Sequence, residues 1–141
     1  MAHLEMLRKD HLALRQALAE LEEVLRAARP QEAVVCRCQL LAQRLQSHIL
    51  QEEETLAPYA ERIQAAMREH RLPDHADSKV VLRDLQELLS SWRFAYAAGS
   101  LLVHLSRLLD ELREYLDEEE RETLPIATAA ETERRPWMEV T

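Results

Sequence analysis

A single glycine, Gly99, occurs in the 141 residues of this chain. Folds rich in β-strands need glycine at many tight turns, so a chain with one glycine favours long elements and few turns. Hydrophobic residues make up 47% of the sequence and charged residues 31%, which is enough for one continuous core and a polar surface. Leucine, alanine, glutamate and arginine dominate, and all four favour helix. We therefore predict an all-α protein, and the length suits one domain.

Apolar residues recur at alternating steps of three and four, the spacing of one face of a helix. The first such stripe covers residues 4–25, and its helix should end before Pro30, because proline disfavours helix in the residue before it. The second begins near Glu32, and we expect Pro58 to kink it or to end its regular part.

Two further stripes follow in the second half of the chain. The segment 71–74 contains Pro73 and is the clearest break before a third helix, which carries His75 and extends to Trp92. Residues 93–100 include the lone glycine and are predicted to form the next turn, with a fourth helix over 101–126. These four helices predict an up-down-up-down four-helix bundle over residues 1–130, followed by a polar C-terminal tail over 131–141.

Charge and composition limit the partners and the location. The formal net charge is −8, which disfavours nucleic acid as a partner because binding to phosphates requires cationic side chains. No apolar run approaches the ~20 residues of a membrane span, and the N-terminus lacks the apolar segment of a signal peptide. Cys36 and Cys38 are too close together on a helix to form a disulfide easily. We expect a cytoplasmic protein without a membrane partner, and the sequence leaves open a homo-oligomer or an unidentified protein partner.

Five polar residues interrupt the apolar stripes at positions that face the core. A buried carboxylate without a partner costs several kcal/mol, so charged groups inside a bundle are usually paired or bind a metal. His11 and His48 lie at nearly equal distances along the chain from the turn at Pro30, so in antiparallel helices they should meet at the same height. The five residues are candidate metal ligands: His11, His48, Glu52, His75 and Glu119.

Two segments carry a resemblance to a known family. The segment HILQEEETLAP at 48–58 resembles the pattern H-x-x-x-E-E-x-x-L-x-P of hemerythrin-like HHE cation-binding domains, and YLDEEERETLP at 115–125 is similar to a second copy of it. The segments KDH at 9–11 and DHAD at 74–77 resemble the first-helix and third-helix segments of the family, and the resemblance covers roughly residues 5–127.

The resemblance implies a site of two non-haem iron ions with an oxo or hydroxo bridge. His11, His48 and His75 would be terminal ligands, and Glu52 and Glu119 bridging carboxylates. On the third helix, His70 is the main rival of His75.

At position 115 the chain has a tyrosine where the family pattern has histidine. A phenolate is a hard oxygen ligand suited to ferric iron, so Tyr115 can coordinate the cofactor, donate a hydrogen bond to a ligand, or fill space beside an open position. The glutamates that flank the two motifs, Glu53, Glu54, Glu118 and Glu120, are expected to form a solvated acidic face.

The sequence thus predicts a non-haem di-iron protein that binds or reacts with dioxygen, peroxide or nitric oxide. Sensing, scavenging, storage and iron-related roles fit a chain that shows no second catalytic domain. Weak oxidase or peroxidase activity at such a site stays open. The alternatives are a helical bundle with one metal ion, such as zinc, and a metal-free bundle that acts through contacts with other proteins.

Overall fold

The computed structural model describes residues 2–27, 31–69, 78–92 and 98–134, and all its regular elements are helical. This confirms the predicted all-α class. In chain order the elements are α1 (Ala2–Arg26), α2 (Gln31–Leu56), the 3₁₀ turn η1 (Ala57–Tyr59), α3 (Ala60–Glu69), α4 (Ser78–Trp92), α5 (Ala98–Glu118), the π-helical turn η2 (Glu119–Thr123) and α6 (Leu124–Arg134). Among the described residues, no helix has both the length and the apolar character that crossing a membrane requires.

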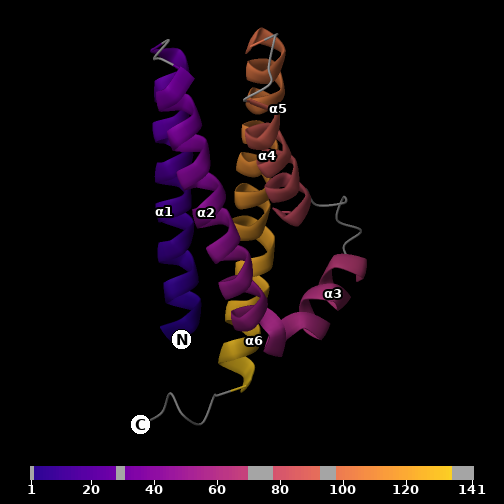
Figure 1. Ribbon diagram of the computed structural model, residues 1–141. Coiled ribbons are helices and arrows are strands. Elements are labelled where there is room, and N and C mark those ends of the chain that lie inside the picture. Colours follow the sequence, from indigo (N-terminus) through magenta and orange to yellow (C-terminus); the bar gives the residue numbers. More distant parts are fainter. Residues whose placement is uncertain (1, 28–30, 70–77, 93–97, 135–141) are drawn as a thin grey trace.

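Helices α1, α2, α4 and α5 lie side by side along the molecule (Figure 1). Arg37 pairs with Glu20 across α1 and α2 at one level, and the rings of His11 and His48 meet at another. The residue numbers rise along one helix as they fall along the other, so the two helices are antiparallel. Helix α1 is also antiparallel to α5 and α6, since Glu22 pairs with Arg113 of α5 and Arg8 bonds to Thr128 of α6. The arrangement is consistent with the predicted up-down-up-down order.

Two clusters of buried apolar side chains form the core. The larger, here called the main cluster, joins α1, α2, α4 and α5 and includes Leu14, Leu45, Leu85 and Leu112. The smaller, here called the end cluster, joins the other end of α1 to the α2–η1 junction and to α6. Its buried members are Leu4, Leu7, Leu56, Tyr59, Leu124 and Ala127.

Between the two clusters lie four polar residues, here called the polar layer: His11, His48, Glu52 and Glu119. His11 follows Leu7 and precedes Leu14 on the same face of α1, so it interrupts a stripe that is otherwise apolar. The same holds for the layer's residues on α2 and at the start of η2. The core thus isolates a single polar level between two apolar ones.

Pro58 ends α2, as the sequence predicts. Helix α2 stops at Leu56, and the proline occupies the start of the 3₁₀ turn η1. Helix α3 then leaves the direction of α2 and turns aside at the end of the bundle (Figure 1). Its partly buried Ile63 packs on the end cluster, which also contains residues of α6.

The predicted turn over 93–100 is too long at its C-terminal end, because α5 begins at Ala98. Gly99 therefore lies in the first turn of a helix, and glycine's cost of about 1 kcal/mol per helical position is a weak preference that tertiary packing overrides. The predicted fourth helix is also not continuous, since η2 divides it.

Helix α6 continues past the predicted start of the C-terminal tail at residue 131 and ends at Arg134. Glu131 is 4% exposed, and the hydroxyl of Tyr59 donates a hydrogen bond to it. The first residues of the predicted tail are thus helical and packed. The division of the chain at residue 130 stays a prediction.

Candidate metal centre

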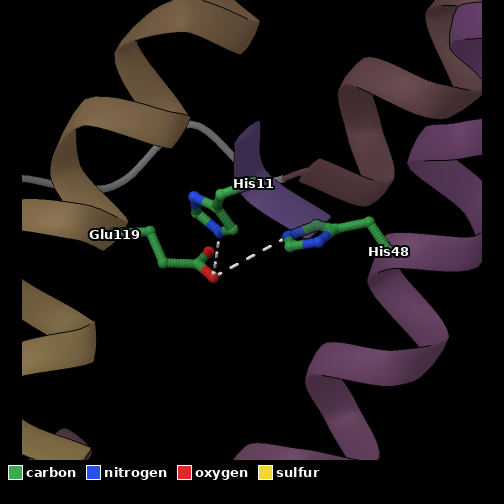
Figure 2. Close-up of side chains that lie close together, drawn as sticks. All are labelled: His11, His48 and Glu119. Carbon is green, nitrogen blue, oxygen red and sulfur yellow. Dashed lines mark hydrogen bonds and ion pairs between the residues drawn. The ribbon is translucent and has the colours of Figure 1, made fainter. Parts of the chain in front are cut away.

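Three buried side chains from three elements meet at the polar layer. His11 comes from α1, His48 from α2 and Glu119 from the first position of η2, and none is more than 3% exposed. One donor atom of each lies within 4.8 Å of those of the other two (Figure 2). In the described part of the chain this is the one group of three or more such residues that is suited to hold a metal ion.

Both imidazoles direct Nε2 at the same carboxylate oxygen. His11 Nε2 lies 2.9 Å from Glu119 Oε1, and His48 Nε2 lies 3.8 Å from that atom. The two ring centroids are 4.7 Å apart with an interplanar angle of 69°. The prediction that His11 and His48 meet at one height is therefore confirmed.

Glu52 and Tyr115 extend the cluster on the α2 side. Glu52 is one helical turn beyond His48, and its Oε2 lies 3.0 Å from His48 Nε2. The hydroxyl of Tyr115 donates a hydrogen bond to Glu52 and lies 3.3 Å from His48 Nε2. Tyr115 thus contacts the polar layer through its hydroxyl, although its ring belongs to the main cluster.

Charged residues outside the polar layer contact the other ring nitrogens of the two histidines. Asp10 Oδ2 lies 2.5 Å from His48 Nδ1, and Glu120 Oε1 lies 3.4 Å from His11 Nδ1. Arg15 donates to both carboxylate oxygens of Glu120, at 3.0 and 2.5 Å.

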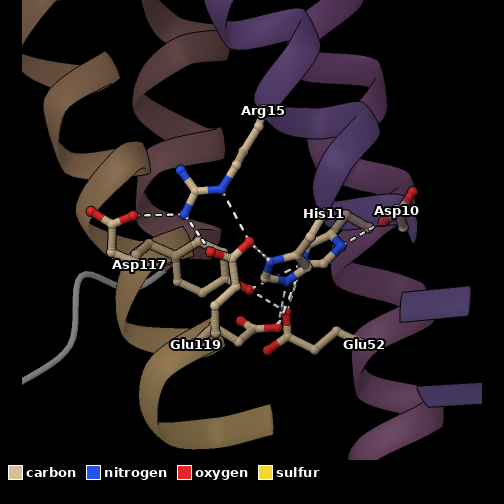
Figure 3. A network of polar contacts seen from close by, with 9 residues as sticks. Asp10, His11, Arg15, Glu52, Asp117 and Glu119 are labelled. Atoms are coloured by element: carbon tan, nitrogen blue, oxygen red, sulfur yellow. Dashed lines mark hydrogen bonds and ion pairs between the residues drawn. The ribbon is translucent and has the colours of Figure 1, made fainter. Parts of the chain in front are cut away.

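Arg15 also reaches Asp117 at 2.6 Å, on the side away from the histidines (Figure 3). Sequence reasoning missed the roles of Asp10, Arg15 and Glu120, because neighbours of a core residue on a helix are ordinarily assigned to the solvated face. Their one signal is adjacency to a ligand candidate or a position one turn beyond it.

The predicted acidic face is wrong at Glu118, which is 7% exposed at the last position of α5. Glu119, the first residue of the π-helical turn η2, is 3% exposed, so two successive residues are buried here, as Tyr115 and Leu116 are one turn earlier. A π turn adds a residue to one helical turn, and such turns are frequent at functional sites. Glu120 is half-buried and bonded to Arg15, whereas Glu53 and Glu54 are exposed as predicted.

A family model for the hemerythrin HHE cation-binding domain matches residues 3–127. The chain belongs to this family. No curated protein and no solved structure matches the chain significantly. The HHE match covers both motif segments and all five residues predicted as metal ligands, and it makes the polar layer the place to look for the bound cation.

The donor atoms of the polar layer have the chemistry and the spacing that a metal ion requires. Imidazole nitrogen and carboxylate oxygen are ligands for iron and zinc. Two donors that each bind one ion at about 2.1 Å lie roughly 3.0 to 3.4 Å apart. The separations of His11 from Glu119 (2.9 Å) and of His48 from Glu52 (3.0 Å) are near this range. The residues present therefore fit a metal ion.

The electrostatic environment of the polar layer favours the charged forms of His48 and Glu119. Burial alone would lower the pKa of His48, but the carboxylates of Glu119, Glu52 and Asp10 raise it to about 10. Burial alone would raise the pKa of Glu119, but His11 and His48 hold it well below its usual value. A cation at this place would take over the role of the histidine proton and would displace it.

The electrostatic environment favours the neutral forms of Glu52 and Tyr115 but the charged form of Glu120. Burial, together with the charge of Glu119, raises the pKa of Glu52. Burial and the charges of Glu119 and Glu52 raise the pKa of Tyr115, so its phenol holds its proton and acts as a donor. Arg15 lowers the pKa of Glu120, which keeps that carboxylate charged beside His11.

The third-helix ligand of this HHE domain is not among the residues brought together. His75 and its rival His70 lie outside the described residues. The structure brings together four of the five predicted ligands, and the assignment of His75 stays a prediction.

Proposed function

We propose that this HHE domain is a non-haem di-iron protein, built on an up-down-up-down four-helix bundle, that binds or reacts with dioxygen, peroxide or nitric oxide. We place it in the cytoplasm, in sensing, scavenging, storage or another iron-related role. One observation carries the proposal: the Nε2 atoms of His11 and His48 converge on the buried carboxylate of Glu119 in an otherwise apolar core.

In this proposal His11 and His48 are terminal ligands, and Glu119 and Glu52 are the carboxylates shared between two ions. His75 completes the ligand set from the third helix. Tyr115 contacts the cofactor site through Glu52, to which its hydroxyl donates. Iron, when bound, supplies the capacity to bind small oxygen- or nitrogen-containing ligands and to exchange electrons with them.

The chain's own residues prepare the site in three ways. The main and end clusters surround the polar layer with apolar side chains, which strengthens each charge interaction inside it. The carboxylates supply negative charge for a cation where a neutral core would repel it. The hydrogen bond between His48 Nδ1 and Asp10 leaves Nε2 of that ring facing the centre.

The test is the metal content of the freshly purified protein, followed by ferrous loading without oxygen and an absorption spectrum after exposure to air. We expect about two irons per chain and an oxo-bridge absorption band without a phenolate band. His48→Leu should abolish loading. His104→Leu is the matched control, because His104 lies on α5 and bonds to Arg107 away from the polar layer.

A mononuclear site, such as a zinc site, is the second candidate. The observation that favours it is that the described residues offer a single group of three donors. Zinc would be colourless and would not react with oxygen. One zinc per chain with no spectrum after exposure to air would support this candidate against the di-iron proposal.

Absence of any metal after anaerobic loading would contradict both metal proposals. It would leave a metal-free helical bundle that acts through contacts with other proteins. In that case a chelator would change neither the stability nor the helix content of the protein.

A further inference from the structure

Asp10 contacts a predicted ligand from a neighbouring helix. It lies on α1 directly before His11, and its side chain is 27% exposed. Its Oδ2 is 2.5 Å from Nδ1 of His48 on α2, whose side chain is fully buried. A carboxylate and an imidazole N–H at this separation form a charge-assisted hydrogen bond, which is about twice as strong as a neutral one.

The two nitrogens of the His48 ring face opposite environments. Nδ1 faces Asp10, and Nε2 faces the oxygens of Glu52 and Tyr115 and, further away, Glu119. A neutral imidazole carries its proton on one nitrogen only. Because Asp10 accepts from Nδ1–H, the proton that a bound cation displaces is the one on Nε2, and the lone pair left there faces the centre of the polar layer.

At His11, the carboxylate nearest Nδ1 belongs to Glu120, and it interacts with that nitrogen more weakly than Asp10 does with His48. Glu120 Oε1 is 3.4 Å from His11 Nδ1, and that nitrogen makes no aligned hydrogen bond within the described part of the chain. Both oxygens of Glu120 already accept from Arg15. Asp10 instead makes its described side-chain bond to His48. Of the two histidines, His48 is the one whose Nδ1 is held by a carboxylate from outside the polar layer.

We propose that Asp10 is a positioning residue for metal binding: it holds His48 with the Nε2 lone pair toward the cation and strengthens that nitrogen as a ligand. This inference rests on the proposed function, in which His48 is a metal ligand. Asp10 does not touch the metal itself. Its effect passes through the ring of His48, as outer carboxylates act on ligand histidines in metal sites generally.

The test compares Co²⁺ binding by the full chain and three variants, measured in competition with a chromophoric chelator. Asp10→Ala should weaken Co²⁺ binding by about 10- to 100-fold. Asp10→Asn retains an acceptor but loses the charge, and should weaken binding by roughly 3- to 10-fold. This partial rescue separates orientation of the ring from its electronic strengthening.

Asp84→Ala is the matched control. Asp84 is also 27% exposed and makes one close ion pair, to Arg83 on α4, away from the polar layer. Its replacement should leave the Co²⁺ affinity within about twofold of the wild-type value. Alanine favours helix, so neither alanine variant is expected to disturb its helix.

A second readout reports on the ring directly. In the Zn²⁺-loaded protein, nitrogen-15 NMR of the histidines should show the Nδ1–H tautomer of His48, with a proton protected from exchange. Asp10→Ala should remove that protection, and Asp84→Ala should retain it. A purely structural role of Asp10 would move the urea midpoint without changing the tautomer.

Three results would overturn the inference. If the wild-type chain binds Co²⁺ and Asp10→Ala binds it equally, the positioning role is wrong while the metal site stands. If the wild-type chain binds no Co²⁺, Zn²⁺ or iron, the proposed function fails and the inference with it. If Asp10→Ala does not fold, Asp10→Asn decides, and wild-type affinity with an unchanged Nδ1–H signal contradicts the proposal.

Discussion

Single hydroxyl, carboxyl and imidazole groups decide whether the polar layer is tolerable inside a bundle. Each buried charge in it has a partner from another element: Glu119 has His11 and His48, and Glu52 has Tyr115. A polar network inside a core is stabilising only when its members are satisfied, because one group left without a partner costs 1–3 kcal/mol. Removing one hydroxyl should therefore be measurable.

Tyr115→Phe should destabilise the protein by about 1 kcal/mol, because the half-buried Glu52 loses the hydroxyl that donates to it beside Glu119. Urea unfolding in the presence of a chelator measures this. The same variant should weaken Co²⁺ binding about tenfold, since Tyr115 orients a predicted ligand.

The control for Tyr115→Phe is Tyr59→Phe. Tyr59 is 8% exposed, Tyr115 is 7% exposed, and each hydroxyl donates to a buried or half-buried glutamate. Tyr59→Phe should also lower the stability but should leave the Co²⁺ affinity unchanged. Equal metal affinities in the two variants would show that Tyr115 is an ordinary core residue.

The two cysteines should differ in reactivity. Cys36 is exposed and Cys38 is buried in the main cluster, where burial raises the pKa of its thiol from 9.0 to about 12. The thiolate is the reactive form, so at pH 8 one thiol per chain should react rapidly with a disulfide reagent and the second only after unfolding. Raising the pH to 10 should not make the Cys38 thiol reactive, since its pKa in the folded protein lies above that value. Rapid reaction of two thiols in the native protein would contradict the packing of α2.

At the scale of helices, periodicity predicted most of what the structure shows. The apolar stripes identified the four long helices, and equal rise along antiparallel helices placed His11 and His48 together. The stripes did not reveal the π turn at Glu119, although the next buried residue, Leu124, follows five positions later, because Ile126 also continues the regular spacing seven residues after Glu119. They also could not reveal Asp10, whose contact with His48 depends on how closely α1 and α2 approach.

Arg15 on α1 forms ion pairs with residues at the junction of α5 and η2. It is 29% exposed and pairs with both Asp117 and Glu120, the latter through two nitrogens. Two-pronged pairs of this kind are stronger than single surface contacts. Arg15→Gln should cost about 1 kcal/mol in urea unfolding and should loosen Glu120 beside His11.

The comparison for Arg15 is Arg37→Gln. Arg37 pairs with Glu20 through one nitrogen, and both side chains are more than 40% exposed. Its loss should change the unfolding free energy by no more than about 0.5 kcal/mol. Equal effects of the two substitutions would mean that the Arg15 network adds nothing beyond an ordinary surface pair.

Across the whole molecule, the core consists of two apolar clusters. Each cluster packs continuously without the residues of the polar layer. The main cluster alone joins all four long helices. Small metal domains that lack such a core unfold when the ion is removed. Here the buried apolar surface should hold the bundle together, and the polar groups already pair with one another.

Removal of metal should therefore lower stability without unfolding the chain. With a chelator, the far-ultraviolet circular dichroism should remain helical and unfolding should stay cooperative. Ferrous ion added without oxygen, at 100 times its dissociation constant, should stabilise the fold by about 2.7 kcal/mol for each ion bound, and one ion alone should raise the Tm by roughly 10 °C. His48→Leu should abolish this rise, and His104→Leu should preserve it. Loss of helix with the chelator would show that the ion is structural, and an unchanged Tm on loading would show that the folded state does not bind it.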